Sequence, residues 1–324
     1  MVKFTSGLSA TMEAMLTFKE IHGYSRKTHE HSLTKFDRFC TNHYPNATML
    51  TKEMVLNWLE VESRPKRNGI YHKACAVRQF GKYLVSVGKD AYVLPDDYLR
   101  KKSAFTAHLF TDTELAALFE AIDSLSPNAK LPFMHEIAPV LFRLLYTCGL
   151  RPNEGRELKC ANINLGNGEI LIVNNKRKKQ RLVVMSGDML DLCRNHDLRR
   201  NAFADSNKFF FPNVNDEPYS HIQIRTVFKQ CWAAANLETS ETKLPNVRPY
   251  DLRHRFASAV LHKWLNEGRD LYAMLPYLRS YMGHEHISDT AHYIHVLPEN
   301  LLKSPGVDWD KLDEVVPEVH VWEI

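Results

Sequence analysis

The stretch EILIVNNKRKKQRLVVM (residues 169–185) interrupts a pattern that elsewhere favours helices. Two short runs rich in β-branched residues flank a polar, basic tip, and this pattern predicts a β-hairpin. On both sides of the hairpin, apolar residues recur at the three-and-four spacing of amphipathic helices. The sequence therefore predicts a mainly α fold of the α+β class with a small antiparallel β-sheet.

Several helical patterns precede a Pro-containing, charged stretch, LPDDYLRKKSAFTAH (94–108). Thr51 is a predicted N-cap and Gly88 a predicted C-cap of two of these helices. Because the stretch has the composition of an interdomain linker, we expect three parts: an N-terminal helical domain (1–103), a second domain (104–296) and an acidic tail (297–324).

Two further helices are predicted after the linker, FTDTELAALFEAIDSL (110–125) and MHEIAPVLFRLLYTCGL (134–150). Thr111 or Asp112 is the expected N-cap of the first, and Gly149 closes the second. Helices resume after the hairpin, from about residue 188 onward.

The composition is that of an ordinary globular protein, with 44% hydrophobic and 25% charged residues among 324. No run approaches eighteen apolar residues, so no membrane span is expected. The N-terminus lacks the pattern of a secretion signal. The six cysteines are scattered without a CxxC pair. These features predict a reduced, cytoplasmic protein.

Charge is distributed unevenly along the chain, although the net value is only +4. Residues 1–103 carry 17 Lys and Arg against 10 Asp and Glu, which gives +7, and residues 297–324 carry 2 against 7, which gives −5. A basic N-terminal domain suits a protein that binds a polyanion, and a solvated basic face explains the same count equally well.

Four separated segments carry clustered basic or aromatic side chains: CGLRPNEGREL (148–158), NNKRKKQR (174–181), RPYDLRHRF (248–256) and GHEHISDTAHYIHV (283–296). Taken singly, each has an ordinary structural explanation, such as an arginine bonded to helix carbonyls. The histidines of the last segment do not have the spacing of a zinc motif, and no cysteine is near them. No metal site is predicted.

Together, these segments supply two arginines, a lysine, a histidine and a tyrosine, a set suited to phosphodiester transfer without metal. Arginine forks hold two non-bridging phosphate oxygens at once, and with a histidine donor they stabilise a five-coordinate transition state. Tyrosine can attack as a covalent nucleophile, although its free pKa of about 10 requires nearby cations. A lysine on a hairpin can protonate the departing 5′ oxygen.

At these residues the chain resembles the tyrosine recombinases of the phage-integrase family over most of its length. YTCGLRPNEGREL resembles the first-arginine box, which makes Arg151 the first catalytic arginine and Glu154 its supporting acidic residue. The hairpin resembles the one that carries the catalytic lysine. Counting back from RLVVM gives Lys176, and Lys178 or Lys179 takes this role if the register differs.

Two more boxes complete the resemblance. YDLRHRFAS resembles the second-arginine box, with Arg253 as its arginine, and YMGHEHISDTAHYIHV resembles the closing box, with His284 and the nucleophile Tyr293. The resemblance implies an N-terminal core-binding (SAM-like) helical domain and a mostly helical catalytic domain. It also implies DNA cleavage through a 3′-phosphotyrosine without a cofactor.

One position departs from the family pattern. The family usually has histidine three residues before the second arginine, where this chain has Tyr250. A phenol can donate a hydrogen bond to phosphate but cannot carry positive charge, so we expect altered rather than absent chemistry, with Tyr250 among the catalytic residues. His254 is expected to be structural. The 30-residue separation of Arg253 from Gly283 predicts an additional helix.

The resemblance also implies a partner, double-stranded DNA clamped between two domains, and a homo-oligomer that is monomeric when free and tetrameric in the synapse. The apolar stripe of the tail (Leu312, Val315, Val316 and Val319) is expected to dock on a neighbouring protomer or on its own domain. The predicted DNA contacts are basic residues of three regions: Arg26, Lys27, Lys66, Arg67, Lys73, Arg78 and Lys82 in the N-terminal domain, Lys178 and Lys179 at the hairpin tip, and Arg225 and Lys229 in one catalytic-domain helix.

Three functions fit these observations. A site-specific recombinase for integration or excision of a mobile element is favoured by the box spacing and the hairpin. A type IB topoisomerase shares the chemistry but relaxes DNA as a monomer. A DNA-binding accessory protein with decayed catalysis has Tyr250 as its only support.

Overall fold

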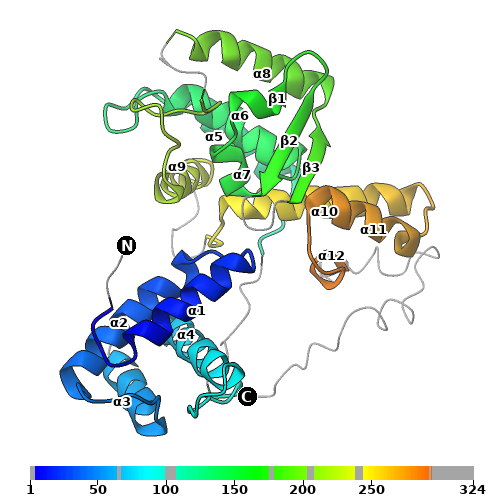
Figure 1. Cartoon of the computed structure of the whole chain (residues 1–324). Coiled ribbons are helices and arrows are strands. Elements are labelled where there is room, and N and C mark those ends of the chain that lie inside the picture. The colour runs from blue at the N-terminus through cyan, green and yellow to red at the C-terminus, as the bar shows by residue number, and fades with distance from the viewer. Residues whose placement is uncertain are drawn as a thin grey trace. The chain divides into compact units, whose positions relative to one another are not determined.

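The computed structural model describes residues 4–63, 67–98, 107–174, 179–202, 208–237, 244–291 and 293. The chain divides into two compact units, one holding helices α1 to α4 and the other the elements from α5 to α12 (Figure 1). The predicted boundary near residue 103 and the predicted tail 297–324 lie outside the described residues, so the domain limits stay predictions.

The first unit consists of α1 (Ser9–Ile21), α2 (Lys27–His43), α3 (Lys52–Ser63) and α4 (Arg67–Ser86). Helix α4 contacts the other three, and the core between them includes Trp58 and Phe36, whose ring centroids are 4.9 Å apart. Thr51 Oγ1 accepts a hydrogen bond from the Met54 amide (3.3 Å), which confirms the predicted cap. Gly88 has φ +77° just after α4, as a C-terminal glycine should.

The second unit is built around α6 (Met134–Thr147), an apolar helix that contacts α5, α7, α8 and α10. Thr111 caps α5 in a capping box with Glu114, so the first of the two predicted caps is correct. The remaining helices of this unit are α5 (Asp112–Asp123), α7 (Pro152–Arg156), η1 (Cys160–Asn162), α8 (Gly187–Arg200), α9 (His221–Ala234), α10 (Pro249–Asn266), α11 (Leu271–Met282) and α12 (Ser288–Ala291).

The predicted hairpin is present and belongs to a three-stranded antiparallel sheet of order β1-β2-β3. Its strands are β2 (Glu169–Asn174) and β3 (Lys179–Val184). The short strand β1 (Ile163–Asn164) was not predicted, and it pairs with β2 so that Ile163 faces Ile170. Two residues are too few to show a strand period in the sequence. The mainly α fold with a small antiparallel sheet is confirmed.

Two left-handed glycines turn the chain toward the site. Gly149 (φ +61°) ends α6 immediately before α7, and Gly283 (φ +64°) ends α11. Gly268 (φ +67°) follows the end of α10, and the chain returns as α11, which is the additional helix predicted after Arg253. In the part of the chain that the structure describes, no helix is long and apolar enough to cross a membrane.

Candidate active site

Arg151 lies at the N-cap of α7, directly after the Gly149 turn. Its backbone N–H donates to Glu154 Oε2 (2.8 Å) and its Nη1 donates to Glu154 Oε1 (2.8 Å). Its Nη2 donates to the Gly283 carbonyl (2.7 Å). The guanidinium is therefore fixed by one carboxylate and one carbonyl, and with 28% of its side chain exposed it remains accessible to a ligand.

Arg253 lies in the second turn of α10 and is fully buried, with 0% exposure. Its Nη1 donates to the Gly149 carbonyl and its Nη2 to the Met282 carbonyl, both at 2.6 Å. Its Nε–H has no acceptor among the described residues. A buried donor without a partner is unfavourable unless a ligand supplies one. Arg253 therefore holds an unsatisfied donor that an anion could bond to only after neighbouring side chains move, because the guanidinium is fully buried.

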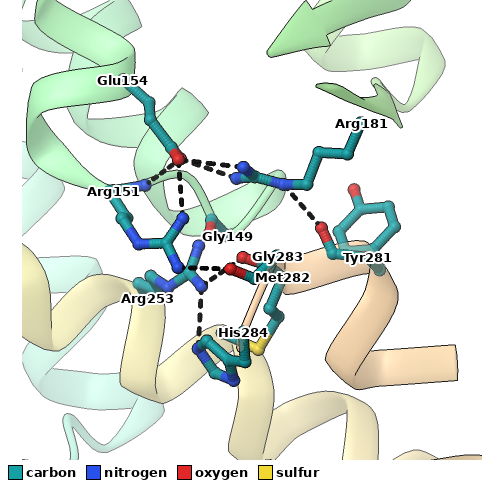
Figure 2. A network of polar contacts seen from close by, with 9 residues as sticks. All are labelled: Gly149, Arg151, Glu154, Arg181, Arg253, Tyr281, Met282, Gly283 and His284. Carbon is teal, nitrogen blue, oxygen red and sulfur yellow. Dashed lines mark hydrogen bonds and ion pairs between the residues drawn. The ribbon is translucent and has the colours of Figure 1, made fainter. Parts of the chain in front are cut away.

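Glu154 joins Arg151 to a third arginine, Arg181 of β3, as Figure 2 shows. Arg181 donates Nη1 to Oε1 (2.9 Å) and Nη2 to Oε2 (2.6 Å) of Glu154, and its Nε donates to the Tyr281 carbonyl (2.8 Å). Burial opposes ionisation of Glu154, but the two guanidinium groups outweigh it and lower its pKa to about 2. The carboxylate is therefore ionised at neutral pH.

Sequence reasoning missed Arg181. It stands at the end of the basic run that forms the hairpin tip, and its carboxylate partner lies 27 residues earlier in the chain. No spacing pattern distinguishes it from its basic neighbours, so only the folded structure identifies its partner.

The three arginines meet at the C-terminal end of α11, where the last helix carbonyls lack intrahelical donors. Three successive carbonyls each accept a guanidinium bond there: Tyr281 from Arg181, Met282 from Arg253 and Gly283 from Arg151. Three guanidinium charges against the one Glu154 carboxylate leave a local charge of +2 (3 − 1). The cluster thus has the charge and the donors of an oxyanion site.

His284 follows the α11 terminus directly and faces Arg253. Its Nε2 lies 2.9 Å from Arg253 Nη2, and its Nδ1 lies 2.8 Å from Thr290 Oγ1. Because a guanidinium only donates, Nε2 is the acceptor and the ring proton lies on Nδ1. Burial, with the charges of the arginines, lowers the pKa of His284 to about 3. The imidazole is therefore neutral at neutral pH.

Tyr293 lies against His284 and is buried, with 3% exposure. The two rings are stacked with centroids 5.9 Å apart and an interplanar angle of 25°. Burial raises the pKa of Tyr293 to about 12, although a hydrogen bond and the charge of Arg253 act in the opposite direction. The phenol is protonated at neutral pH, and its oxygen lies within reach of Arg253.

Tyr250 belongs to the same cluster, on α10. Burial lowers the pKa of Arg151, but Glu154 and a hydrogen bond with Tyr250 outweigh this and raise it. The Tyr250 ring centroid lies 5.1 Å from that of His254, and the His254 centroid lies 5.2 Å from that of Tyr293. His254, expected to be only structural, thus contacts both tyrosines. Its i,i+4 spacing from Tyr250 was a signal that both side chains share one helix face.

The hairpin lysines cannot be placed in the same way. Lys176 and Lys178 lie outside the described residues, and Lys179 begins β3 with a side chain that the structure does not describe. The assignment of the general acid among them stays a prediction.

The basic residues predicted to contact DNA differ in their surroundings. Arg26 pairs with Glu13, Glu20 and Glu30, which ties α1 to α2. Arg78 is buried and donates to the backbone carbonyls of Leu94, Pro95 and Asp96. These two arginines serve the fold of the first unit, which is a role that the sequence did not indicate.

The other predicted DNA contacts include exposed side chains. Lys27 is exposed at the start of α2, and Arg225 is exposed on α9. Lys82 pairs with Asp96, Lys229 donates to Asn246 Oδ1 (2.6 Å), and Lys73 lies on α4. Lys66 lies outside the described residues, and Arg67 begins α4 with an undescribed side chain. All eleven DNA contacts stay predictions.

No group of three or more His, Cys, Asp or Glu side chains within the described ranges is arranged to hold a metal ion. His292 and His295 of the histidine-rich segment lie outside those ranges.

The chain is similar in sequence to known recombinases. The model of the phage integrase family matches residues 109–300. The Sinorhizobium fredii protein y4rE, named as an integrase/recombinase, is 28% identical over 302 residues, which are 91% of this chain and 93% of that protein. Tyrosine recombinase XerC of Pediococcus pentosaceus is 29% identical over 248 residues, 74% of each chain.

The fold is also similar to that of solved recombinase structures. The XerH site-specific recombinase, bound to its difH substrate after cleavage, superposes with a TM-score of 0.62 at 19% identity, covering 88% of this chain and 80% of that one. The Tn1549 transposon integrase gives a TM-score of 0.62 at 13% identity, covering 90% of this chain and 96% of that one. The chain belongs to the phage integrase family of tyrosine recombinases, which are DNA strand-transferring enzymes.

Proposed function

We propose that this protein is a site-specific recombinase that cleaves and rejoins DNA through a covalent bond between Tyr293 and a 3′ phosphate. The observation that carries the proposal is the convergence of Arg151, Arg253, His284 and Tyr293, from separate segments of the chain, on one partly enclosed cationic cluster. That convergence supports a single role for boxes that each had an ordinary explanation in isolation.

The two arginines supply the electrostatic part of the mechanism. A phosphodiester carries one negative charge and its five-coordinate transition state carries two, so a local charge of +2 favours the transition state over the ground state. The buried Nε–H of Arg253, without an acceptor among the described residues, gains one from a non-bridging oxygen. Donors of Arg151 and Arg253 now bonded to the α11 carbonyls can be shared with the phosphate.

Tyr293 supplies the nucleophile. Its phenolic oxygen forms a bond to phosphorus while the bond from phosphorus to the 5′ oxygen breaks. The phenolic proton passes to the imidazole of His254, which is in ring contact with Tyr293, because Nε2 of His284 already accepts from Arg253 and its Nδ1 carries a proton. Because the phenol starts with a pKa of about 12, attack depends on the charge of Arg253 and of the phosphate-bound arginines.

The leaving 5′ oxygen takes a proton from a hairpin lysine, Lys176 in our assignment, with Lys178 or Lys179 as alternatives. Tyr250 replaces the usual histidine as a neutral hydrogen-bond donor toward the phosphate, which its contact with Arg151 supports. The reaction conserves bond energy in the phosphotyrosine, so it requires neither a nucleotide nor a metal ion.

The partner is double-stranded DNA, and the relatives support this proposal. The similar XerH structure is described as a complex with difH substrate and the Tn1549 integrase structure as a complex with transposon end DNA. Exchange of two duplexes needs four cleavages, so we expect a tetrameric synapse, with the tail 297–324 as a link between protomers. Integration or excision of a mobile element, in the cytoplasm, is the proposed setting.

The test uses a nicked suicide duplex carrying the recombination site from the element that encodes the protein, without divalent metal. We expect wild type to form a covalent protein–DNA adduct on a denaturing gel and Tyr293→Phe to bind equally well but form none. Tight, specific binding by wild type without an adduct would favour an accessory protein instead. Relaxation of plasmid by dilute, monomeric protein would favour a type IB topoisomerase.

A further inference from the structure

Arg181 uses each of its three nitrogens to bond to groups inside the site. Its three nitrogens make three bonds, two to the Glu154 carboxylate and one to the Tyr281 carbonyl. Its side chain is 11% exposed and that of Glu154 14%. A bidentate pair of this kind fixes the rotation of the carboxylate as well as its position.

The fixed carboxylate sets the direction of Arg151. Each oxygen of Glu154 accepts one bond from Arg151 and one from Arg181 (Figure 2). If Arg181 were absent, the carboxylate could rotate about its last side-chain bond, and the guanidinium of Arg151 would rotate with it. Small displacements of this kind are costly for catalysis, since about 1 Å of misplacement can cost about 100-fold in rate.

The third bond of Arg181 connects the same carboxylate to the α11 terminus. The Tyr281 carbonyl that accepts from Arg181 Nε is three residues before His284. Gly283 makes this approach possible, since a Cβ at that position would lie 3.0 Å from Arg181 Nη1 and 3.1 Å from its Cδ. Arg181 thereby joins α7, which Arg151 precedes as N-cap, to β3 of the hairpin and to the end of α11, which His284 follows.

We propose that Arg181 is a positioning residue for strand cleavage, acting through Glu154 on Arg151 and through the Tyr281 carbonyl on the segment that carries His284. The inference rests on the proposed cleavage function, and no contact between Arg181 and DNA is part of it. The proposal assigns a role to Arg181, which follows the predicted catalytic lysine in the hairpin. None of the sequence boxes identified this residue.

The proposal has an electrostatic consequence that a purely structural role would lack. Glu154 is largely buried, and without Arg181 only one adjacent cation would keep it ionised, so its pKa would rise from about 2. Where the carboxyl is protonated, it no longer accepts both bonds from Arg151, and cleavage should fall as the pH is lowered. The charged or titratable groups around Glu154 that must be considered are Arg151 on α7, Arg181 on β3, Arg253 on α10, and Tyr281 and His284 at the end of α11.

The experiment compares Arg181→Met, Arg181→Lys and Arg156→Met in the full-length chain, by the single-turnover rate of adduct formation on the suicide duplex and by DNA affinity. Arg156 is the matched control, because it lies on α7 close to Glu154 but bonds to Asn153, Glu157 and the Tyr219 carbonyl instead. We expect Arg181→Met to cleave about 10- to 100-fold more slowly than wild type, with DNA affinity within about threefold.

The pH profile separates positioning from general damage. Between pH 8 and pH 5.5, the relative rate of Arg181→Met should fall as the pH falls, and adding Glu154→Gln should flatten its profile. Arg181→Lys keeps a cation beside Glu154 but loses the fork, so it should show a smaller rate loss and a flat relative profile. If Arg181→Met folds poorly, the cleavage rate of Arg181→Lys still tests the proposal.

The outcomes separate the two proposals. Arg181 variants as active as Arg156→Met, or a rate loss independent of pH in Arg181→Met, would overturn the positioning role while wild type still forms its adduct. Absence of an adduct with wild type would instead overturn the proposed function, and the positioning role with it.

Discussion

Tyr250 is the residue at which this chain departs most from the pattern of its family. Its phenol contributes to raising the pKa of Arg151, and its ring lies beside that of His254. A phenol in this place can donate one hydrogen bond to a phosphate oxygen, as an imidazole would, but it brings no positive charge. The +2 charge of the three arginines and Glu154 therefore has to stabilise the transition state without a positive charge at position 250.

From this we predict that Tyr250→Phe cleaves about 100-fold more slowly than wild type, because one donor to the transition state is lost. DNA affinity should change little, since a single neutral donor contributes little to the binding of a long duplex. Tyr250→His should keep most of the activity. Single-turnover adduct formation measures the rates, with Tyr277→Phe, on the exposed part of α11, as the control. Wild-type rates in Tyr250→Phe would contradict a role in the chemistry.

At this scale, the sequence identified Arg151, Glu154, Arg253, His284 and Tyr293, and the structure brings them together, although their catalytic roles stay predictions. Each of these lies in a box with fixed spacing on a helix or at a helix end, so local geometry nearly determines its direction. The sequence did not identify Arg181 as a site residue, because its partner Glu154 is distant in sequence. A pairing between β3 and α7 produces no periodic pattern of residues.

The caps at helix ends set the boundaries of the elements that carry the site. Caps such as Thr111 and the glycines at 88 and 149 can be recognised in the sequence because few residue types tolerate these conformations. Helix α4 begins at Arg67, and its first turn carries no clear apolar period that would mark this start in the sequence. Short elements such as β1 depend on pairing with a neighbouring strand, so they cannot be predicted from their own sequence.

Gly149 is the cap on which the site depends most. Its φ is +61°, its carbonyl accepts from Arg253, and an added Cβ would lie 2.4 Å from Phe256 Cδ1. Gly149→Ala therefore combines left-handed strain with a clash, and we predict a loss of about 3 kcal/mol or more in the free energy of unfolding. Gly268→Ala meets the same strain at φ +67° with nothing within 4 Å, so about 1 kcal/mol is expected.

Urea denaturation of the two alanine variants and wild type checks this prediction, and both substitutions lie in the same unit, so their difference isolates the clash. Equal losses for the two variants would mean that Phe256 moves aside without cost. A large loss at Gly149 should also lower the cleavage rate, because the carbonyl that holds Arg253 moves with the turn.

On the scale of the whole molecule, two kinds of basic residue must be distinguished. Arg26 and Arg78 are engaged by carboxylates and carbonyls of the first unit, so their charge serves the fold. Lys27 and Arg225 are exposed, on α2 and α9. Sequence counts of charge cannot make this distinction, because they weigh a buried ion pair and an exposed lysine equally. The +7 balance of residues 1–103 already subtracts these carboxylates, so the pairing changes which basic side chains can meet a polyanion and not the net charge.

Salt dependence can test which charges meet DNA. Each phosphate contact releases about one counterion, so removing a contacting residue should reduce the slope of log affinity against log salt by about 1. We predict this reduction for Arg225→Ala, measured by fluorescence anisotropy on a labelled duplex between roughly 50 and 200 mM salt. Arg199→Ala is the control, since Arg199 is also an exposed arginine of the same unit but pairs with Glu136. An unchanged slope in Arg225→Ala would place the DNA on another face of the catalytic unit, because an arginine that touches no phosphate releases no counterion.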